Sequence, residues 1–515
     1  MSAHAIHVLD SSDTIGVALR DLSAGETFDL PEHSSITLRE SVPRGHKVAI
    51  TAVGADEPVT KYGTIIGLAL RPIAAGEHVH EHNLKFVPSD LERSRRAPEP
   101  LIDHLSQRTP PIPERRTFRG YRRTDSSAGT RNYLAVISTV NCSATVVRRI
   151  AAQAEARGLL ERFPTIDGIV AITHDQGCGH GGSLGIETLR RTLRGYATHP
   201  NVGGVVLVGL GCEMNLMEGM LDDLELRPGV PLASFTVQDI GGTKAAIDHG
   251  LAALESMAPK VADVAREDIP VSELVLGLNC GGSDGWSGLT ANPALGYASD
   301  LIVAQGGRSV LAETPEIYGA EQLLIERAVR PEIAETLLDR LAWWEEYTAA
   351  AGGSLDNNPS PGNKDGGITT ILEKSLGAVA KAGTAPLTAV YEFAEPITER
   401  GLSFMDTPGY DPVSVTGLIA GGCTLIAFTT GRGSAIGTRP SPTVKLSTNS
   451  DTYRRMRDDM DLDCGDIVEL GVSIEEKGLE IYNLLLDIAS GQPTKSEDLG
   501  YGENEFVPWQ LGAVT

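Results

Sequence analysis

Four cysteines of this 515-residue chain share one local setting, because each follows an apolar, strand-like stretch by no more than five residues. They are Cys142, Cys178, Cys212 and Cys280. Parallel strands present their carboxyl ends at one edge of a sheet, so several of these thiols can converge there. Thiolates favour soft and borderline metals. We therefore expect two or more of the four to bind iron, as a single ion or as an iron–sulfur cluster.

Each cysteine taken alone also fits a plainer role, as a small apolar residue in a tight, buried turn. No pair has the C-x-x-C spacing of a zinc ribbon, so structural zinc is not expected. The chain holds six cysteines in all, which is too few for a secreted disulfide scaffold.

The stretch "CGGSDGWSGLTANP", residues 280–293, lies between a predicted strand and a predicted helix. Its paired glycines let the backbone approach a ligand closely. Ser283 and Asp284 are candidates for holding substrate hydroxyls or donating a proton. Asn292, placed before Pro293, predicts a helix N-cap, and the helix would then point its N-terminus at the site. The alternative is an irregular loop without function.

A second glycine-rich stretch, "TTGRGSAIGTRPSPTVK" at residues 429–445, carries Arg432, Arg439 and Lys445. Free backbone N–H groups in such a loop form an anion-binding nest, and arginine adds a fork that matches a carboxylate. The glycine spacing differs from the G-x-G-x-x-G of dinucleotide-binding loops. The stretch therefore predicts a carboxylate site, with Arg432 and Lys445 as substrate contacts.

A third stretch, "PSPGNKDGG" at residues 359–367, offers Asn363 and Lys364 as polar contacts for the same ligand. Its alternative interpretation is a plain surface turn.

All twelve histidines lie at or before His249. His78, His80 and His82 alternate, which in a strand places them on one face. We interpret them as a solvated strand edge, although their spacing also suits a metal.

Seven apolar runs alternate with helical patterns and glycine-rich loops, which indicates an α/β fold whose mainly parallel sheets are buried on both faces. The runs are 132–140, 167–173, 202–210, 232–237, 274–279, 308–314 and 423–430.

Four segments are expected along the chain. Residues 1–87 contain short strands and the repeat "LRDLSAGETF" and "LRPIAAGEHV", which predicts a small all-β module. Residues 88–118 are rich in proline and charged residues, which indicates a linker. Two α/β domains should follow, at 119–265 and 266–515, the second being catalytic.

The net charge of −24 argues against nucleic acid or an anionic membrane as a partner. No apolar run reaches membrane-spanning length, and the first residues lack a signal peptide pattern. We expect a cytoplasmic protein that binds a small molecule, with a homo-oligomer as a candidate assembly.

Several long motifs resemble the altronate and galactarate dehydratase family. They include "GYRRTDSSAGTRNYLAVISTVNC", "CGGSDGWSGLTANPALG", "NPSPGNKDGGITTILEKSLG" and "TTGRGSAIGTRPSPTVK", and the resemblance runs from about residue 12 to about residue 490. The N-terminal module resembles the SAF domain (β-clip) of that family. Within the family, "AGEHVHEHN" and "PEIYGAEQLL" look more like the altronate branch.

The resemblance implies an iron-dependent lyase that removes water from a sugar acid to give a 2-keto-3-deoxy acid. Such an elimination needs a base for the C2 proton, an acid or metal for the C3 hydroxyl, and positive charge near the carboxylate. His174 and His46 occupy positions that the family shares and are candidate catalysts beside Asp284. His46 and its neighbour Lys47 should reach from the module across a cleft towards the glycine-rich loops.

Other functions stay open at this point. Galactarate, rather than altronate, is an alternative substrate. A carbon–sulfur lyase acting on sulfolactate resembles the chain from residue 119 onward, but its SAF-like part is a separate chain. A sugar-acid binding protein without a metal is a further alternative.

Overall fold

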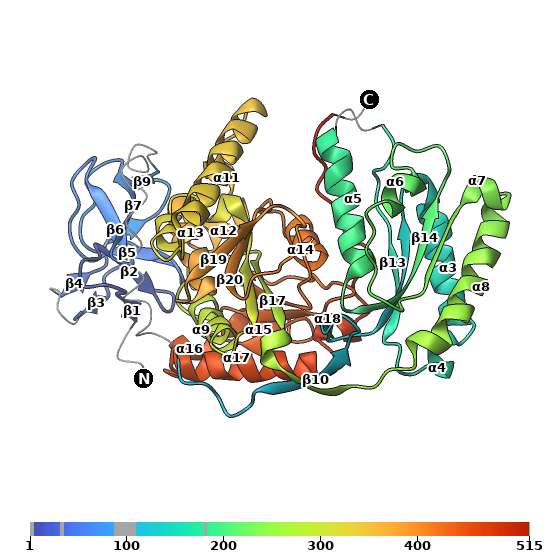
Figure 1. The fold of residues 1–515 in the computed structure, drawn as a ribbon. Coiled ribbons are helices and arrows are strands. Elements are labelled where there is room, and N and C mark those ends of the chain that lie inside the picture. The colour runs from blue at the N-terminus through green and yellow to red at the C-terminus, as the bar shows by residue number, and fades with distance from the viewer. Residues whose placement is uncertain (1–4, 31–34, 87–109, 180–182, 514–515) are drawn as a thin grey trace.

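The structure, a computed structural model, describes residues 5–30, 35–86, 110–179 and 183–513. Figure 1 shows three bodies in a row: a blue β module on one side, a central α/β domain built from the C-terminal half, and a second α/β domain on the other side. The expected fold class is confirmed. Residues 88–109 of the expected linker lie outside the described part of the chain.

The N-terminal module is all β, with three small antiparallel sheets ordered β1-β2-β5-β8, β6-β7-β9 and β3-β4. Its nine strands are β1 (Ile6–His7), β2 (Ile15–Ala18), β3 (Thr27–Phe28), β4 (Ile36–Thr37), β5 (Lys47–Ala49), β6 (Pro58–Lys61), β7 (Thr64–Ala69), β8 (His78–Val79) and β9 (Leu84–Lys85). The pleat turns buried valines and isoleucines inward, and two small apolar cores result.

The second domain has a four-stranded parallel sheet ordered β13-β12-β14-β15, flanked by helices. Its elements are β10 (Thr117–Arg122), β11 (Ala128–Gly129), β12 (Tyr133–Ser138), η2 (Asn141–Ser143), α3 (Ala144–Ala156), α4 (Leu159–Arg162), β13 (Gly168–Ile172), α5 (Ser183–Thr198), β14 (Val202–Gly209), α6 (Met217–Leu221), β15 (Leu232–Thr236), α7 (Val237–Ile240), α8 (Thr243–Val261) and β16 (Glu267–Pro270). Strand β10 begins inside the segment assigned to the linker, because buried Phe118 pairs with Ile269 of β16.

The C-terminal domain is built on a seven-stranded parallel sheet ordered β19-β20-β18-β17-β21-β22-β23. Its strands are β17 (Val275–Cys280), β18 (Arg308–Leu311), β19 (Leu387–Tyr391), β20 (Gly401–Met405), β21 (Leu425–Thr430), β22 (Thr443–Ser447) and β23 (Leu462–Asp463).

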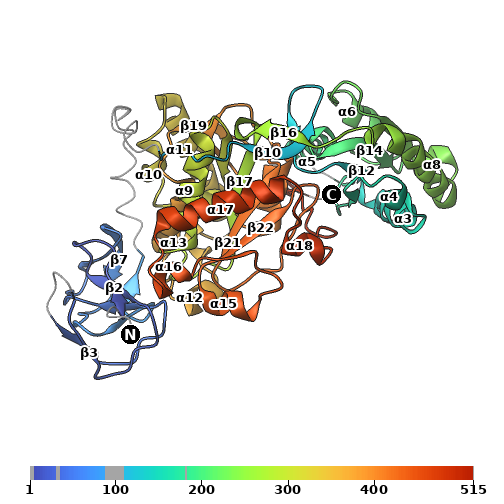
Figure 2. The same cartoon turned by 90° about the horizontal axis from the view of Figure 1, so that it is seen from below.

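Helices cover both faces of this sheet, and Figure 2 shows α17 running across the domain beside α9. The helices are η3 (Val271–Glu273), α9 (Ala291–Val303), η4 (Thr314–Glu316), α10 (Gln322–Ile325), α11 (Pro331–Ala350), η5 (Leu355–Asn357), α12 (Pro361–Asp365), α13 (Ile371–Val379), η6 (Ala380–Ala382), α14 (Asp411–Ala420), α15 (Ser450–Arg455), α16 (Asp466–Glu469), α17 (Ile474–Ala489) and α18 (Lys495–Asp498). In the part of the chain that the structure describes, no helix is long and apolar enough to cross a bilayer.

Each of the seven apolar runs contains a strand, as predicted. Strands β19, β20, β22 and β23 lie outside the predicted runs. Strand β22 lies in the stretch interpreted as a loop and alternates Thr443, Lys445 and Ser447 with two apolar residues. All five of its residues are buried. Polar residues in a buried strand hide the apolar signal on which the prediction depended.

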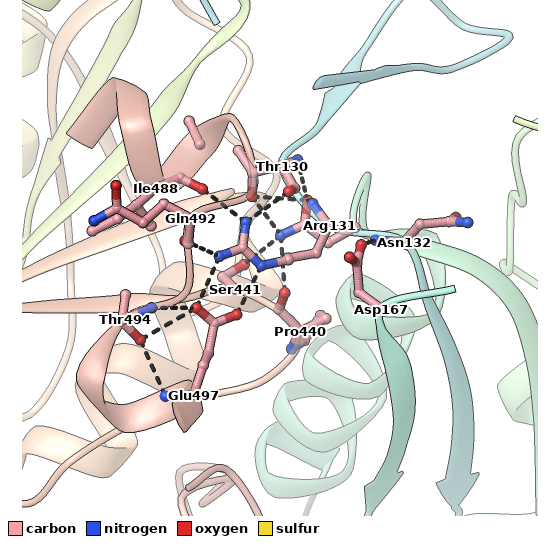
Figure 3. A network of polar contacts seen from close by, with 12 residues as sticks. Thr130, Arg131, Asn132, Asp167, Pro440, Ser441, Ile488, Gln492, Thr494 and Glu497 are labelled. Atoms are coloured by element: carbon pink, nitrogen blue, oxygen red, sulfur yellow. Dashed lines mark hydrogen bonds and ion pairs between the residues drawn. The ribbon is translucent and has the colours of Figure 1, made fainter. Parts of the chain in front are cut away.

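Arg131 ties the second domain to the C-terminal domain (Figure 3). Its guanidinium donates to both carboxylate oxygens of Glu497, at 2.7 and 2.8 Å, and to the carbonyls of Ile488 and Gln492. Because Arg131 is buried and all these acceptors belong to the C-terminal domain, this network holds the two domains in a defined arrangement.

Candidate active site

The carboxyl edge of the seven-stranded sheet gathers polar residues from several strands. Cys280 ends β17, and Glu313 follows β18 by two residues. Asn449 follows β22 by two residues. Neighbouring parallel strands bring these positions together, which is where ligands bind in open α/β sheets.

Three possible metal ligands meet at this edge, because donor atoms of Cys280, Glu313 and Glu316 all lie within 4.8 Å of one another. All three residues are buried. The Cys280 thiol donates to Glu316 Oε2 at 3.2 Å, and the ammonium of Lys381 lies 2.7 Å from the sulfur and 3.2 Å from Glu313 Oε2. Burial raises the pKa of the Cys280 thiol well above its usual value, although Lys381 opposes this.

Glu313 is held in a conformation that few residues other than glycine adopt, with φ at 73°. Its backbone N–H donates to Thr407 Oγ1 at 2.9 Å. Carboxylate oxygen Oε2 accepts from Cys280 N and Lys381 Nζ, whereas buried Oε1 has no hydrogen-bond partner. Burial and the nearby Glu316 raise the pKa of Glu313 to about 8. A strained, buried carboxylate with one unused oxygen is typical of a functional group.

Lys374 and Asp411 extend this edge towards the surface. Lys374 Nζ lies 2.8 Å from Glu316 Oε1 and donates to Asn358 Oδ1 at 2.7 Å. Asp411 begins α14, and its carboxylate lies against the backbone of Gly281. Burial and the charge of Glu316 raise the pKa of Asp411 to about 7. This value suits a group that exchanges protons at neutral pH.

The loop after β17 is fixed by Asp284. Its carboxylate accepts from Trp286 N, Ser287 Oγ and Thr448 Oγ1 at 3.0 to 3.1 Å, and from Asn449 Nδ2 at 3.0 Å. Burial raises the pKa of Asp284, and these donors oppose the rise. With four donors engaged, Asp284 organises the loop in this structure.

Ser283 and Asn363 connect two of the predicted stretches, since Asn363 Nδ2 donates to the Ser283 carbonyl at 2.9 Å. The stretch 359–367 contains helix α12, and Asn363 of that helix forms a capping box with the N-cap residue Ser360. A small cavity beside them is lined by Lys61, Ser283, Asp284, Asn292, Lys374 and neighbouring residues.

Asn292 is not the helix N-cap, because α9 begins at Ala291 and Thr290 occupies the cap position. Proline is tolerated throughout the first helical turn, so Pro293 does not fix the start. Instead, Asn292 Nδ2 donates to the Gly377 carbonyl at 2.8 Å, and its Oδ1 accepts from Thr429 at 2.6 Å.

The N-terminal module closes over this edge through two buried lysines. Lys47 and Lys61 each lie 2.8 Å from a carboxylate oxygen of Glu373 in α13. Burial lowers the pKa of Lys47 to about 8. Burial opposes ionisation of Glu373, but the two ammonium groups outweigh it and hold the pKa of that carboxyl well below its usual range. Lys47 therefore anchors the module in this structure.

His46 also reaches the C-terminal domain, where its Nε2 lies 3.2 Å from the Asp365 carbonyl. Its Nδ1 lies 3.0 Å from Nε2 of His78. The three alternating histidines are not a solvated edge, since His78 and His80 are half-buried and only His82 is exposed. Burial lowers the pKa of His46, and burial together with the neighbouring imidazole of His46 lowers that of His78 to about 3.

The remaining predicted contacts lie in different surroundings. Lys364 pairs with Glu81 of the module. Arg432 is exposed, and its backbone N–H donates to the Gly282 carbonyl at 2.8 Å, so its side chain starts beside the 280–293 loop. Lys445 lies in β22, buried, with Nζ 5.6 Å from the ring centre of Tyr501 and without a hydrogen-bond partner.

The other three cysteines belong to the second domain and are exposed. Cys142, Cys178 and Cys212 follow the neighbouring strands β12, β13 and β14, so they share one sheet edge. Within the described residues, these thiols do not form a group of three metal-ligating atoms within 4.8 Å. Gln238 Nε2 lies 3.5 Å from the sulfur of Cys212.

His174 is buried beside this second edge. Its Nε2 lies 3.0 Å from the Ser138 carbonyl, and its Nδ1 accepts from Gln176 N at 3.1 Å. Both ring nitrogens are engaged by backbone groups, an arrangement that holds the turn after β13.

Sequence reasoning missed the charged residues of the buried edge: Glu313, Glu316, Lys374, Lys381 and Asp411. A signal was present for some of them. Glu313 and Glu316 follow an apolar strand directly, and Lys381 interrupts the apolar, small-residue stretch "LGAVAKAGTAPL". Charged residues in such surroundings are rarely buried without a partner or a function.

Family profiles match nearly the whole chain. Residues 4–87 match "Altronate/galactarate dehydratase SAF domain", residues 120–262 match "D-galactarate dehydratase/Altronate hydrolase, second domain", and residues 271–514 match "D-galactarate/Altronate dehydratase, C-terminal".

Individual relatives match over the same length. The chain is 37% identical to the altronate dehydratase of Bacillus subtilis, over 96% of this chain and 97% of the relative, and 37% identical to that of Escherichia coli, over 96% of each. It is 35% identical to the galactarate dehydratase (L-threo-forming) of Escherichia coli, over 100% of this chain and 98% of the relative.

Proposed function

Because the chain belongs to the altronate and galactarate dehydratase family, we propose that it is a hydro-lyase that removes water from a sugar acid, with altronate as the preferred substrate. The product would be the 2-keto-3-deoxy acid. The observation that carries this proposal is full-length similarity to dehydratases across all three domains. Altronate is favoured over galactarate because the two altronate dehydratases are slightly more similar to the chain.

Iron is the proposed cofactor, with Cys280, Glu313 and Glu316 as the residues that would hold it. The donor chemistry fits Fe2+, which accepts both thiolate and carboxylate ligands. The unused Oε1 of buried Glu313 and the separation of the three donor atoms support this choice. When bound there, iron would act as a Lewis acid on the departing hydroxyl.

Charge balance at the edge is compatible with a divalent ion. Lys374 and Lys381 supply two positive charges, while Glu313, Asp411 and the Cys280 thiol have raised pKa values. These three groups can release protons when a cation arrives, as metal ligands commonly do.

A second candidate site for iron consists of Cys142, Cys178 and Cys212. A cluster, in which each cysteine binds a different iron atom, accepts sulfurs that stand further apart than the ligands of one ion. Because the three thiols do not form a group within 4.8 Å among the described residues, we propose a cluster rather than a single ion for that edge.

The remaining roles are assigned to residues at the buried edge. Asp411 is proposed to transfer the proton at C2, because it lies at the sheet edge beside Gly281 and its pKa is near 7. Arg432, exposed beside the same loop, is proposed to bind the C1 carboxylate with its fork. Lys374 adds positive charge next to Glu316. His46, His174 and Asp284 are then positioning residues.

The test is an assay of the full chain, purified without oxygen and supplied with Fe2+, for 2-keto acid formation from altronate and from galactarate. We expect turnover of altronate with the higher kcat/KM. Turnover of neither acid, with iron bound, would contradict the proposed function. A cytoplasmic location and a homo-oligomeric state stay parts of the proposal.

A further inference from the structure

A buried network of hydrogen bonds holds the turn that carries Glu313 and Glu316. Thr407 follows β20 by two residues, at the carboxyl edge of the seven-stranded sheet. Its Oγ1 accepts from the backbone N–H of Glu313 at 2.9 Å, and its carbonyl accepts from the N–H of Thr314 at 2.9 Å. The preceding residue, Asp406, accepts from Thr314 Oγ1 at 2.5 Å. Side-chain and backbone groups of these two residues therefore fix the start of the turn.

The Thr407 hydroxyl is also bonded to helix α14 and, through it, to strand β17. Its Oγ1 lies 2.8 Å from Ser414 Oγ, which accepts from Asn279 Nδ2 at 2.7 Å. Thr407 Oγ1 donates to the Pro408 carbonyl at 3.1 Å. Because that carbonyl only accepts, we assign the hydroxyl hydrogen of Thr407 to it, and Ser414 is then the donor to Thr407. The Thr407 oxygen thereby uses its hydrogen and both of its lone pairs.

The partners of Thr407 lie next to residues assigned to the site. Asn279 directly precedes Cys280, and Ser414 lies about one helical turn after Asp411. Asn279, Ser414 and Thr407 are all fully buried. One hydroxyl thus connects three elements that carry site residues: β17, α14 and the turn after β18.

Glu313 needs such support, because its φ of 73° is unfavourable for a residue with a side chain. A residue stays in this region only when its surroundings hold it there. We propose that Thr407 is a positioning residue, whose hydroxyl keeps the Glu313 carboxylate in place to bind a metal ion together with Cys280 and Glu316. This role rests on the proposed function, of which iron binding at this edge is a part. It does not require Thr407 to touch the metal or the substrate.

The experiment measures Co2+ binding to the full chain after serine replaces the three exposed cysteines of the second domain, Cys142, Cys178 and Cys212. Co2+ accepts thiolate and carboxylate ligands, and an intense sulfur-to-metal charge-transfer band reports its bond to Cys280. Thr407→Val should weaken Co2+ binding by at least about tenfold, because valine has the shape of threonine but leaves the buried Glu313 N–H without an acceptor. Thr407→Ser keeps the hydroxyl and should stay within about threefold of the parent chain.

Ser403→Ala is the matched control. Ser403 lies in β20, the strand that Thr407 follows, and its buried hydroxyl has no hydrogen-bond partner among the described residues. Removing this hydroxyl should leave the Co2+ affinity and the charge-transfer band unchanged. Circular dichroism would show that each variant folds. Should Thr407→Val not fold, Thr314→Val removes the bond to Asp406 instead, with the same expected loss of affinity.

Three results would overturn the proposal. The first is a folded Thr407→Val chain that binds Co2+ as tightly as the parent chain. The second is a Thr407→Ser chain that binds as weakly as Thr407→Val, which would assign the loss to packing of the methyl group. The third is a parent chain that binds no Co2+ through Cys280, which would remove the iron site as well. All three are read from metal binding, so a failure to turn over sugar acids with binding intact would count against the proposed function alone.

Discussion

The carboxyl edge of the seven-stranded sheet and that of the four-stranded sheet both carry residues that can bind metals, but they differ in burial and spacing. At the first, Cys280, Glu313 and Glu316 are buried with donor atoms within 4.8 Å. At the second, Cys142, Cys178 and Cys212 are exposed, and their thiols do not form such a group within the described residues.

The two edges differ in burial because different elements pack over them. Helix α13 and the residues after it bring Lys374 and Lys381 over the first edge, and the module anchors on Glu373 of the same helix. Burial lowers the local dielectric, so each charge has a large effect on its neighbours and their pKa values shift. At the first edge, the elements that close over the strand ends therefore bury charged residues and shift their pKa values.

Asp411→Asn tests the buried edge where we expect the largest effect. Removing the proton-transferring carboxylate should lower kcat by about 10³-fold while the chain stays folded. The measurement is keto acid formation from altronate with Fe2+ present. As a matched control, Asp175→Asn changes an exposed aspartate of the second domain, close in sequence to Cys178, and should keep kcat within about twofold. Equal kcat values for Asp411→Asn and Asp175→Asn would show that Asp411 is not the catalytic residue at the edge of the seven-stranded sheet.

Glu373→Gln tests the closure of the first edge by the module. Removing a buried carboxylate that pairs with two lysines leaves those charges uncompensated and should cost about 3 to 5 kcal/mol of unfolding free energy. Denaturant unfolding measures this loss. Glu26→Gln, which breaks the exposed pair with Arg20, should cost less than about 1 kcal/mol.

The same pair of chains gives a pH test. The pKa of Glu373 is lowered in the folded chain, so its contribution to stability is present above its unfolded pKa of about 4.3 and is lost as the pH falls below that value. Wild-type stability should therefore drop more steeply below about pH 4.3 than that of Glu373→Gln. Parallel curves for the two chains would show that this carboxylate does not support docking.

Arg432→Lys tests the proposed carboxylate contact. The variant keeps the charge but loses the fork, and we expect kcat/KM on the best sugar acid to fall by about 2 to 4 kcal/mol in free-energy terms, with the fold retained. Near-normal kcat/KM would mean that the carboxylate is bound elsewhere, with Lys364 and the rest of the 359–367 stretch the next place to test.

The exposed cysteines should give the smallest effect on stability. Cys142→Ser, Cys178→Ser and Cys212→Ser should each change the unfolding free energy by no more than about 0.5 kcal/mol, as is usual for surface positions without buried partners. A loss of several kcal/mol in any of them, measured by denaturant unfolding, would indicate that the edge is buried or metal-bound in solution.

Much of the scaffold could be predicted from the sequence. The apolar runs that became β12, β14 and β17 are buried on both faces, so their composition alone indicates a parallel sheet. Strand β22 was missed because Lys445 and its polar neighbours are buried through tertiary packing, which local composition does not record.

The candidate site was harder to predict, because its key contacts join residues far apart in the chain. Cys280 lies 101 residues from Lys381 and 33 from Glu313. A sequence motif indicates only residues within one stretch of the chain. Asp284 and Asn292 were therefore predicted as site residues, whereas in the structure their side chains hold the loop in place. Only the order of strands in the sheet brings β17, β18 and the helices beyond them together.

Iron content is the direct test of iron binding by Cys280, Glu313 and Glu316. Wild type, Cys280→Ser, Glu313→Gln and Cys178→Ser would be purified without oxygen, supplied with Fe2+, and analysed for bound iron and for acid-labile sulfide. We expect one iron and no sulfide in wild type and in Cys178→Ser, and at least a tenfold loss of iron affinity in Cys280→Ser and Glu313→Gln. Sulfide in wild type, with iron lost from Cys178→Ser and kept in Cys280→Ser, would contradict it and place the metal at the edge of the second domain.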